Sequence, residues 1–520
     1  MNYGELFHVT LPETALDLAA LLVLLVDLAF LRKAALQVRL SSAAVIGVIG
    51  CLAAMWAVGM QTSAGFSVDG LLVLANGGVT AVAQMGVLVL TAVTLLLLID
   101  SSFTKHPGEF VAVVLMAASG GLVISAARDL LVIFIGLELL SIGLYILTAF
   151  GKTSAKSAEA ALKYYLFGGM SAAFLLFGFS YFYGLTGSTN LYEIQSSIAN
   201  SGSSPLLIVA WVLVVAGLGF KVAAVPFHLW APDTYEGAPA PAAAFIASVS
   251  KIASFTLLLT FSFQWLQVSN EYLSGARPAV EHYIVSAYQS WQHLALVLLI
   301  AAVASMIVGN LAALAQTSVR RLLAYSAIAH AGYILLGIAI YSTYSGQSDV
   351  MSFWGNAFNA GVISQNAVLY YVLTYGLTTI GAFGVIGVVE RTTGSDKLDA
   401  FLGLHKRNPV LAAVLLILFL SLAGIPPLVG FWAKFNLFAA VLAVGGGVWP
   451  FALVALAVAM SAVSLYYYLQ VLKRAYVMPA VDDTPIHVHP VTMLVLMAIA
   501  AAVVLAGCLP SVLQGWIASF

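Results

Sequence analysis

The chain is poor in charge and in cysteine. Of its 520 residues only 8% are charged, 62% are hydrophobic, and the mean hydropathy is +1.03. This composition lies outside the range of soluble globular proteins and indicates a polytopic membrane protein. The two cysteines, Cys51 and Cys508, are too few for a disulfide framework, a four-cysteine iron-sulfur cluster or a thiolate zinc site. We therefore expect no redox centre in this chain, and a net charge of -1 gives no reason to expect nucleic acid binding.

The start of the chain lacks a secretory signal. MNYGELFHVTLPETALD is acidic where a signal would be basic, and the apolar run after it has no small-residue cleavage site. We expect a retained first membrane helix. Metal ligands are also scarce: IHVHP at 486–490 has two histidines and no further ligand nearby, so no metal site is expected.

Long apolar runs, in contrast, are abundant. A membrane-spanning helix needs about 20 mostly apolar residues. On this basis the sequence predicts an all-α polytopic protein with about fourteen transmembrane helices and both termini on one side of the membrane. The predicted spans are 14–31, 42–60, 79–99, 110–127, 130–150, 160–185, 206–225, 241–264, 292–315, 322–341, 366–389, 409–425 continuing to 445, 450–472 and 491–513.

Lysine and arginine are distributed unequally over the connections. Fourteen of the twenty lie in odd-numbered connections, whereas even-numbered ones hold only Arg128 and Arg277. Because cytoplasmic loops are enriched in these residues, the odd connections are predicted to be cytoplasmic and both termini periplasmic, in a bacterial inner membrane. Four lysines remain inside the predicted spans: Lys163, Lys221, Lys251 and Lys434.

These intramembrane charges suggest function. Each costs about 2.5 to 3.5 kcal/mol on insertion scales. Glu138 and Lys251 lie about 12 and 15 Å along their helices, too deep for easy snorkelling. One structural ion pair could explain a single Glu and a single Lys. One carboxylate cannot neutralise three or four lysines, however, so some lysines must be uncharged, hydrated or sharing protons, which favours proton handling.

Other polar residues are ambiguous. Lys163 lies near a cytoplasmic helix end, where its side chain could snorkel. His228 and His330 could be hydrogen-bonded core histidines or members of a relay between lysines. Asp27, close to Arg32 and Lys33, is predicted to form an interfacial ion pair.

Prolines break two of the predicted helices. Pro226 follows Lys221 in the seventh span, and Pro426 and Pro427 precede Lys434 in the twelfth. Non-helical backbone at membrane depth survives where it is buried in protein or lines a wet cavity. An odd offset of five helices is typical of inverted-topology repeats with ion sites at broken helices. Two unrelated proline kinks are the alternative.

Four long motifs carry a resemblance to a known family. They are AEAALKYYLFGGMSAAFLLFGFSYFYGLTGS, GLGFKVAAVPFHLWAPDTYEGAPAPAAAFIASVSKIASF, VRRLLAYSAIAHAGYILLG and LSLAGIPPLVGFWAKF. Together they resemble the antiporter-like membrane subunits of respiratory complex I, the proton-pumping NADH:quinone oxidoreductase, and most closely its N-type subunit. The resemblance implies fourteen helices with two inverted five-helix units. It divides the chain into three N-terminal helices at 1–109, a first unit at 110–264, a second at 265–472, and a last helix at 473–520.

The resemblance also implies roles. Glu138 would pair with Lys221 on the broken seventh helix, Lys251 would be the relay lysine of the eighth, and Lys434 the terminal lysine of the broken twelfth. Lys434 argues against the M-type paralogue, which is expected to place a glutamate there. The L-type paralogue also has lysine, but it is expected to carry a long lateral helix after the core. Expected partners are the M-type and small K-type subunits and the lipid bilayer. NADH, FMN, iron-sulfur clusters and quinone are expected in partner subunits and none in this chain, whose GLGFKV lacks the last glycine of a dinucleotide fingerprint.

The mechanism expected from these residues is a switch. Closing the Glu138–Lys221 pair would hold Lys221 protonated, and opening it would release a proton toward Lys251, then by waters and His330 toward Lys434. The alternatives are a cation/proton antiporter subunit, a subunit of a related membrane-bound dehydrogenase or hydrogenase, and a scaffold without transport, which would leave the buried charges unexplained.

Overall fold

The computed structural model describes most of the chain. The described residues are 3–61, 65–68, 70–201, 204–273, 279–340, 350–443, 448–480 and 484–519. Side chains are described for these except at 199–201, 263–273, 279–293, 340 and 350–363. Arg277, one of the two basic residues in even-numbered connections, lies outside the described residues.

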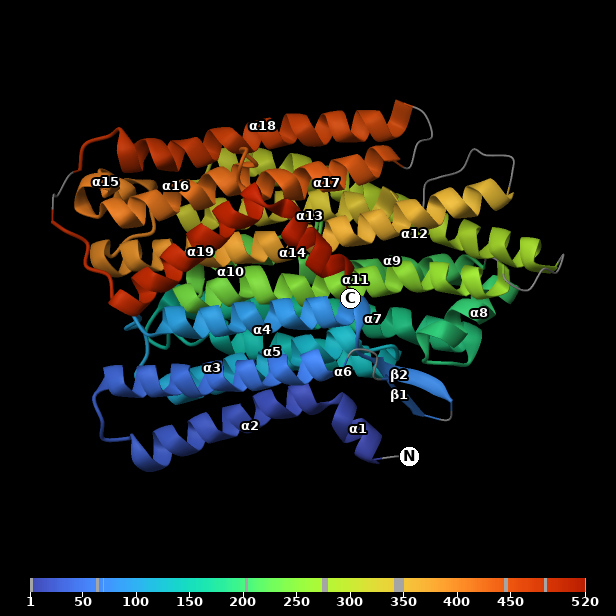
Figure 1. Ribbon diagram of the computed structural model, residues 1–520, viewed down its shortest axis with the longest axis horizontal. Coiled ribbons are helices and arrows are strands. Elements are labelled where there is room, and N and C mark those ends of the chain that lie inside the picture. The colour runs from blue at the N-terminus through green and yellow to red at the C-terminus, as the bar shows by residue number, and fades with distance from the viewer. Residues whose placement is uncertain are drawn as a thin grey trace.

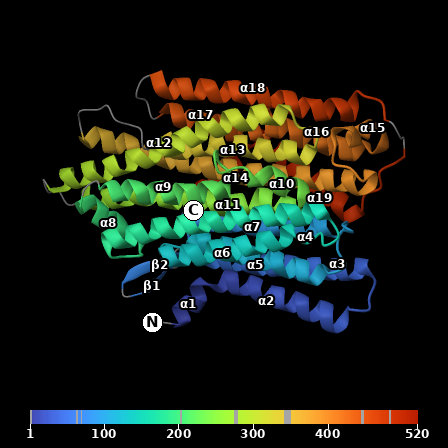
Figure 2. The same cartoon turned by 180° about the vertical axis from the view of Figure 1, so that it is seen from behind.

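The described chain forms a bundle of long, roughly parallel helices (Figure 1), which the reverse view shows equally well (Figure 2). The helices of the first half are α1 (Tyr3–Val9), α2 (Leu11–Leu25, continued by a π-helical turn Val26–Phe30), α3 (Leu36–Met60), α4 (Gly78–Leu98), α5 (Pro107–Ala126), α6 (Leu130–Thr148), α7 (Ala155–Thr186), α8 (Leu191–Ser201), α9 (Pro205–Val222), α10 (Trp230–Gly237) and α11 (Ala240–Leu273). Those of the second half are α12 (Ala279–Leu314), α13 (Val319–Ile340), α14 (Val350–Thr393), a 3-10 turn Leu398–Phe401, α15 (Leu404–Arg407), α16 (Pro409–Ala423), α17 (Val429–Ala443), α18 (Val448–Tyr476), α19 (Pro490–Cys508) and α20 (Pro510–Ala518).

The all-helical membrane architecture predicted from the sequence is confirmed. Within the described residues, twelve helices are long and apolar enough to cross a bilayer, and a thirteenth span is obtained if α1 and α2 with its π-helical turn count as one helix bent by 73°. The predicted twelfth span corresponds to α16 and α17, which are each too short to cross alone.

Some elements differ from the sequence expectation. Strands β1 (Gly65–Val68) and β2 (Leu71–Ala75) form an antiparallel hairpin, and α8 is a short surface helix; neither was predicted. Helices α11, α12 and α14 extend well beyond the predicted spans. The predicted spans cover only the apolar runs of the sequence. A helix can continue beyond its apolar portion, so these helices are longer than the runs that predicted them.

The short connection between α5 and α6 is formed as predicted. Asp129 caps α6: its Oδ1 accepts hydrogen bonds from the backbone N–H groups of Leu131 and Val132 at 2.9 and 3.4 Å. Its Oδ2 accepts a third from Thr189 at 2.6 Å. Because the cap satisfies backbone donors that would otherwise be unpaired, two membrane helices can follow one another with only three residues between them.

Helices α11 and α13 are the innermost. Their apolar windows are 100% and 94% buried within the protein, compared with 17% for α18. The long α14 packs against both α11 and α17, and so joins the two halves of the bundle. Lys251 on α11 and His330 on α13 are therefore enclosed by other helices of the protein.

The two helix breaks are built in the same way. Helix α9 is capped by Ala223, whose φ of 59° is left-handed, and Ala224 N–H bonds to Gly219 O at 2.8 Å. Helix α16 is capped by Gly424, with a φ of 86°, and Ile425 N–H bonds to Leu420 O at 3.0 Å. In both, a bond spanning five residues closes the helix, as in the Schellman motif. Each break also has a cis proline peptide bond at the same distance from its cap, before Pro226 and before Pro427.

Candidate intramembrane lysine site

Lys221 lies in the last turn of α9, immediately before the first break. Its side chain is buried, and its Nζ donates a hydrogen bond to the hydroxyl of Ser141 on α6. The Nζ atom also lies 5.9 Å from the ring centre of Tyr145 and 5.5 Å from that of Phe220. The ammonium group is thus held by a neutral hydroxyl and two aromatic faces.

Glu138 lies one turn before Ser141 on α6. It is partly buried, and it interacts electrostatically with Lys221. No ion pair within 4.0 Å joins the two side chains among the ion pairs of the described residues. Ser141 therefore occupies the position next to the ammonium, and direct pairing of Glu138 with Lys221 stays a prediction.

Lys251 extends from α11 to the end of the same broken helix. Its Nζ donates to the carbonyl oxygen of Val222, the last residue of α9, and to that of Ala327 on α13, both at 3.1 Å. The residue is only 3% exposed. The carbonyls at a helix C-terminus carry about half a negative elementary charge, so this end of α9 stabilises a cation.

Lys434 occupies the corresponding position at the second break. From α17 its Nζ donates to the carbonyls of Leu422 and Ala423, the last two residues of α16, at 3.2 and 3.0 Å. A third bond of 2.8 Å goes to the hydroxyl of Ser461 on α18, and the ring of Tyr333 lies 5.4 Å away. Both breaks thus place a buried lysine on the exposed carbonyl end of a half-helix.

His330 lies on α13, within electrostatic range of both Lys251 and Lys434. The hydroxyl of Tyr371 is 2.8 Å from its Nδ1 and that of Tyr468 is 3.4 Å from its Nε2, while the Tyr375 ring packs against the imidazole with centres 4.8 Å apart. Each ring nitrogen therefore has a hydroxyl that can donate or accept a proton. A role for His330 in connecting the two lysines stays a prediction.

Lys163 lies apart from these residues, at the outer end of α7. Its Nζ is 2.7 Å from Glu159 of the same helix and 2.7 Å from Asp233 on α10, and 41% of its side chain is exposed. Asp233 also pairs with Arg321 of α13 at 2.6 Å. Burial alone would raise the pKa of Asp233, but the hydrogen bonds from Lys163 and Arg321 lower it below its ordinary value. These contacts fasten α10 to its neighbours.

Two further expectations have clear outcomes. His228 lies in the first break, partly buried, and its Nδ1 has no hydrogen-bond partner among the described residues. None of the hydrogen bonds of the described residues joins His228 to Lys221, Lys251 or Lys434. Asp27 forms an ion pair, but the predicted partners, Arg32 and Lys33, were wrong. Arg39, in the first turn of α3, donates to both carboxylate oxygens of Asp27 at 2.7 and 2.6 Å.

Sequence reasoning missed the neutral partners of the lysines. Ser141, Ser461, Tyr371 and Tyr468 accept or share hydrogen bonds with the predicted residues. Only Ser141 offered a signal, since it is three residues from Glu138 and so on the same helix face. In the described part of the chain, no three His, Cys, Asp or Glu side chains come together as a metal site would require.

Comparison with known proteins shows which family this chain resembles. A family model described as NADH:quinone oxidoreductase/Mrp antiporter matches residues 127–275, 280–355 and 350–461. A chain of respiratory complex I from Thermus thermophilus, solved with bound aureothin, superposes with a TM-score of 0.73 at 31% identity, covering 97% of this chain and 98% of that one. A chain of the Mrp complex from Dietzia has a TM-score of 0.78 at 19% identity, and shows the same fold.

The fold and the buried lysines define an antiporter-like, ion-translocating membrane subunit. NADH-quinone oxidoreductase subunit N 2 from Acidobacterium capsulatum is 46% identical over 99% of both chains, and subunit N 1 from Roseiflexus castenholzii is 40% identical over 85% of this chain and 78% of that protein. This chain belongs to the family of NADH-quinone oxidoreductase subunit N, the proton-translocating membrane subunits of bacterial complex I. The resemblance stated from its motifs is confirmed.

Proposed function

We propose that this chain conducts protons along Lys221, Lys251, His330 and Lys434, driven by quinone reduction elsewhere in complex I. One observation carries the proposal: the three buried lysines contact hydroxyls and carbonyl oxygens but no carboxylate among the described residues. Burial disfavours the ammonium form, whereas helix ends and hydroxyls favour it. Such a lysine binds its proton less tightly than one in a buried ion pair, so it can both accept and release a proton.

Glu138 acts as the switch in this proposal. Lys221 rests on Ser141 while Glu138 stands one turn away on the same helix, so a small change in the lysine side chain would exchange one partner for the other. An opposite charge within about 4 to 6 Å strengthens proton binding by the lysine. Contact with Glu138 would therefore load Lys221, and return to Ser141 would release its proton toward Lys251.

The chain is proposed to consist of two inverted units, 110–264 and 265–472, between helices at 1–109 and 473–520. Two features support this division. The caps at Ala223 and Gly424 have the same form. Ser141 and His330 are each the twelfth residue of the second helix of their unit. Ser141 is hydrogen-bonded to Lys221, and His330 lies within electrostatic range of Lys251 and Lys434.

The assembly around the chain follows from its family. We place an M-type and a small K-type subunit beside it in the membrane, and NADH, FMN, iron-sulfur clusters and quinone in other subunits of the complex. The odd connections are proposed to be cytoplasmic and both termini periplasmic, on the basis of the lysine and arginine distribution.

Substitution of the lysines in the intact complex tests the relay. Lys221→Ala and Lys434→Ala are expected to lower proton pumping in proteoliposomes by about tenfold or more, since each removes a proton-transfer group. Lys152→Ala, at an exposed loop lysine, is the matched control and should pump normally. Normal pumping by a fully assembled Lys221→Ala complex would contradict the proposal. Isolation of the chain without NADH:quinone activity, with sodium-driven proton flux, would instead support the antiporter alternative.

A further inference from the structure

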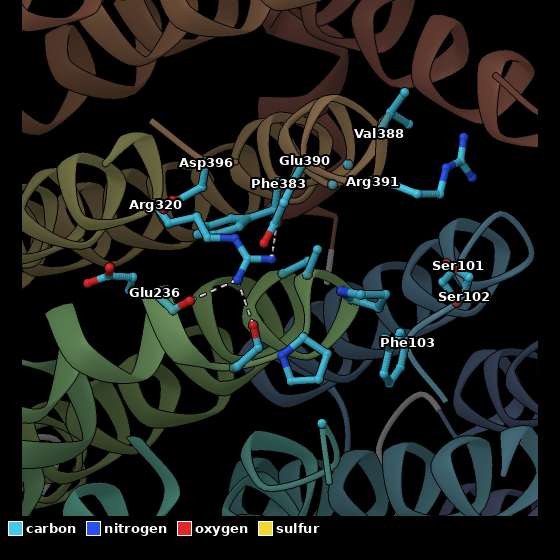
Figure 3. Close-up of a pocket in the computed structure, with 18 of the residues that line it drawn as sticks. Ser101, Ser102, Phe103, Glu236, Arg320, Phe383, Val388, Glu390, Arg391 and Asp396 are labelled. Carbon is cyan, nitrogen blue, oxygen red and sulfur yellow. Dashed lines mark hydrogen bonds and ion pairs between the residues drawn. The ribbon is translucent and has the colours of Figure 1, made fainter. Parts of the chain in front are cut away.

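A cavity of about 600 Å³ opens at one end of the bundle (Figure 3). Its walls come from α10, α11, α13 and α14 and from the connections around Ser101, Ser154 and Ser395. These connections are the third, fifth and eleventh, which are predicted to face the cytoplasm. The lining includes both signs of charge, with Glu390, Arg320 and Glu236 among it, so the site suits water better than an ion of one sign.

An ion pair lies at the inner side of this cavity. Arg320 of α13 is only 4% exposed at its side chain, and its Nη2 is 2.6 Å from Glu390 of α14. Its Nη1 donates to the backbone carbonyls of Glu236 and Ala238, at the C-terminal end of α10, at 3.0 and 2.7 Å. In Figure 3 the guanidinium group bridges these two sides of the cavity. Arg320 thus holds the C-terminal end of α10 and orients the carboxylate of Glu390, whose side chain is 34% exposed.

Aromatic side chains continue from the cavity wall toward His330. Phe383 of the cavity wall packs edge-on against Tyr235, with ring centres 5.7 Å apart. Tyr235 is fully buried, and its hydroxyl has no hydrogen-bond partner among the described residues. Tyr375 lies within electrostatic range of Tyr235 and packs against His330 with ring centres 4.8 Å apart. Buried hydroxyls in proteins are nearly always bonded to protein or to water, so the Tyr235 hydroxyl is a candidate site for a bound water between the cavity wall and Tyr375.

We propose that this cavity, which is lined by residues of both units, is a proton entrance to the relay at His330, with Glu390 as the group that collects protons and Arg320 as the residue that positions it. Water in the cavity transfers a proton to the Glu390 carboxylate, which passes it to inner water near Tyr235 and so to His330, and is left ionised for the next proton. The inference rests on the proposed function, because it supplies the lysine relay with protons from one side. It adds an entry point that the relay itself does not specify.

Paired variants of the cavity test this entrance in the intact complex. Glu390→Gln keeps the shape of the side chain but cannot take up a proton, so pumping in proteoliposomes should fall by about tenfold or more. Glu390→Asp should restore part of it. Asp399→Asn removes an exposed carboxylate from the same connection, and serves as the matched control that pumps normally.

Chemical blocking gives an independent measurement. Ser395→Cys places a thiol at the cavity mouth, in a background with Cys508→Ser to remove the exposed native thiol. A bulky charged thiol reagent added from the side of the cavity should stop pumping in this variant and leave the Cys508→Ser parent unaffected. If Lys434→Ala stops pumping while Glu390→Gln and the blocked thiol do not, the entrance is wrong and the relay stands. If Lys434→Ala also pumps normally, the relay itself is wrong.

Discussion

Lysines from different helices are held in the same chemical environment. Lys251 comes from the helix after the first break and Lys434 from the second half of the other broken helix, yet each donates to the final carbonyl of a half-helix. Interrupting a membrane helix exposes carbonyls that an intact helix would bond internally. The break therefore creates the acceptor, and a lysine supplies the donor. Lys221 differs, since its contact is a serine hydroxyl that a carboxylate can replace.

Removing the Ser141 hydroxyl tests the switch at Lys221. In Ser141→Ala the ammonium loses its neutral acceptor, so it should move to Glu138 and hold its proton more tightly. We expect pumping in proteoliposomes to slow about tenfold, in line with a lost hydrogen bond of about 1 to 1.5 kcal/mol. Ser141→Thr keeps the hydroxyl and should retain most activity. Equal pumping by the Ala and Thr variants would rule out this role for Ser141.

The ionisable residues of the site were largely predictable, and their neutral partners were not. Lys163, Lys221, Lys251 and Lys434 all stand out in the sequence because a charge in a long apolar run is conspicuous. Of the four, Lys163 lies in a partly exposed ion-pair cluster and not at a helix break. Serine and tyrosine in an apolar helix commonly bond to their own backbone or pack, so Ser461 and Tyr468 carried no distinguishing signal. Their contacts depend on how helices distant in sequence pack together.

At the scale of elements, the breaks determine where the site forms. Pro226, Pro426 and Pro427 indicated both interruptions in the sequence. The matching left-handed caps were not predictable, because Ala223 adopts a positive φ that alanine rarely takes, whereas Gly424 takes it readily. The β1–β2 hairpin was not predicted, because its short strands lie in the connection between the predicted spans 42–60 and 79–99 and form no long apolar run.

Exchanging alanine and glycine at the two helix caps is expected to have opposite effects on stability. Gly424→Ala would strain the left-handed backbone and bring the new Cβ to 3.0 Å from Lys434 Cδ, so it should destabilise the fold by about 1 to 2 kcal/mol and weaken pumping. Ala223→Gly removes the corresponding strain and should be neutral or slightly stabilising. Thermal unfolding of the purified complexes, with pumping on the same samples, measures both. A stable, fully active Gly424→Ala complex would show that the second cap does not position Lys434.

At the scale of the whole molecule, the charges of the loops predict its direction in the membrane. The odd connections hold fourteen of the twenty basic residues. Three of these connections, around Ser101, Ser154 and Ser395, help to line the cavity that contains Arg320 and Glu390. Proton uptake at that end and an overall cytoplasm-to-periplasm direction are therefore consistent with one another.

Orientation can be measured with single thiols. Lys152→Cys lies in an odd connection and Ser188→Cys in an even one, both placed in a Cys508→Ser background. An impermeant thiol reagent should label the Ser188→Cys variant in intact spheroplasts and the Lys152→Cys variant only in inverted vesicles. The reverse pattern would overturn the predicted orientation, while the fold would be unaffected.

Helix α19 packs against the second break, between α16 and α17, through the backbone of Gly507. A Cβ on Gly507 of α19 would come within 2.1 Å of Pro427 O, and the Gly507 carbonyl accepts a bond of 2.8 Å from the Trp432 indole. Backbone therefore contacts backbone where α19 meets the Pro426–Pro427 break. Even a methyl group at position 507 would have no space, so the distance between α19 and the start of α17 is set by the two backbones themselves.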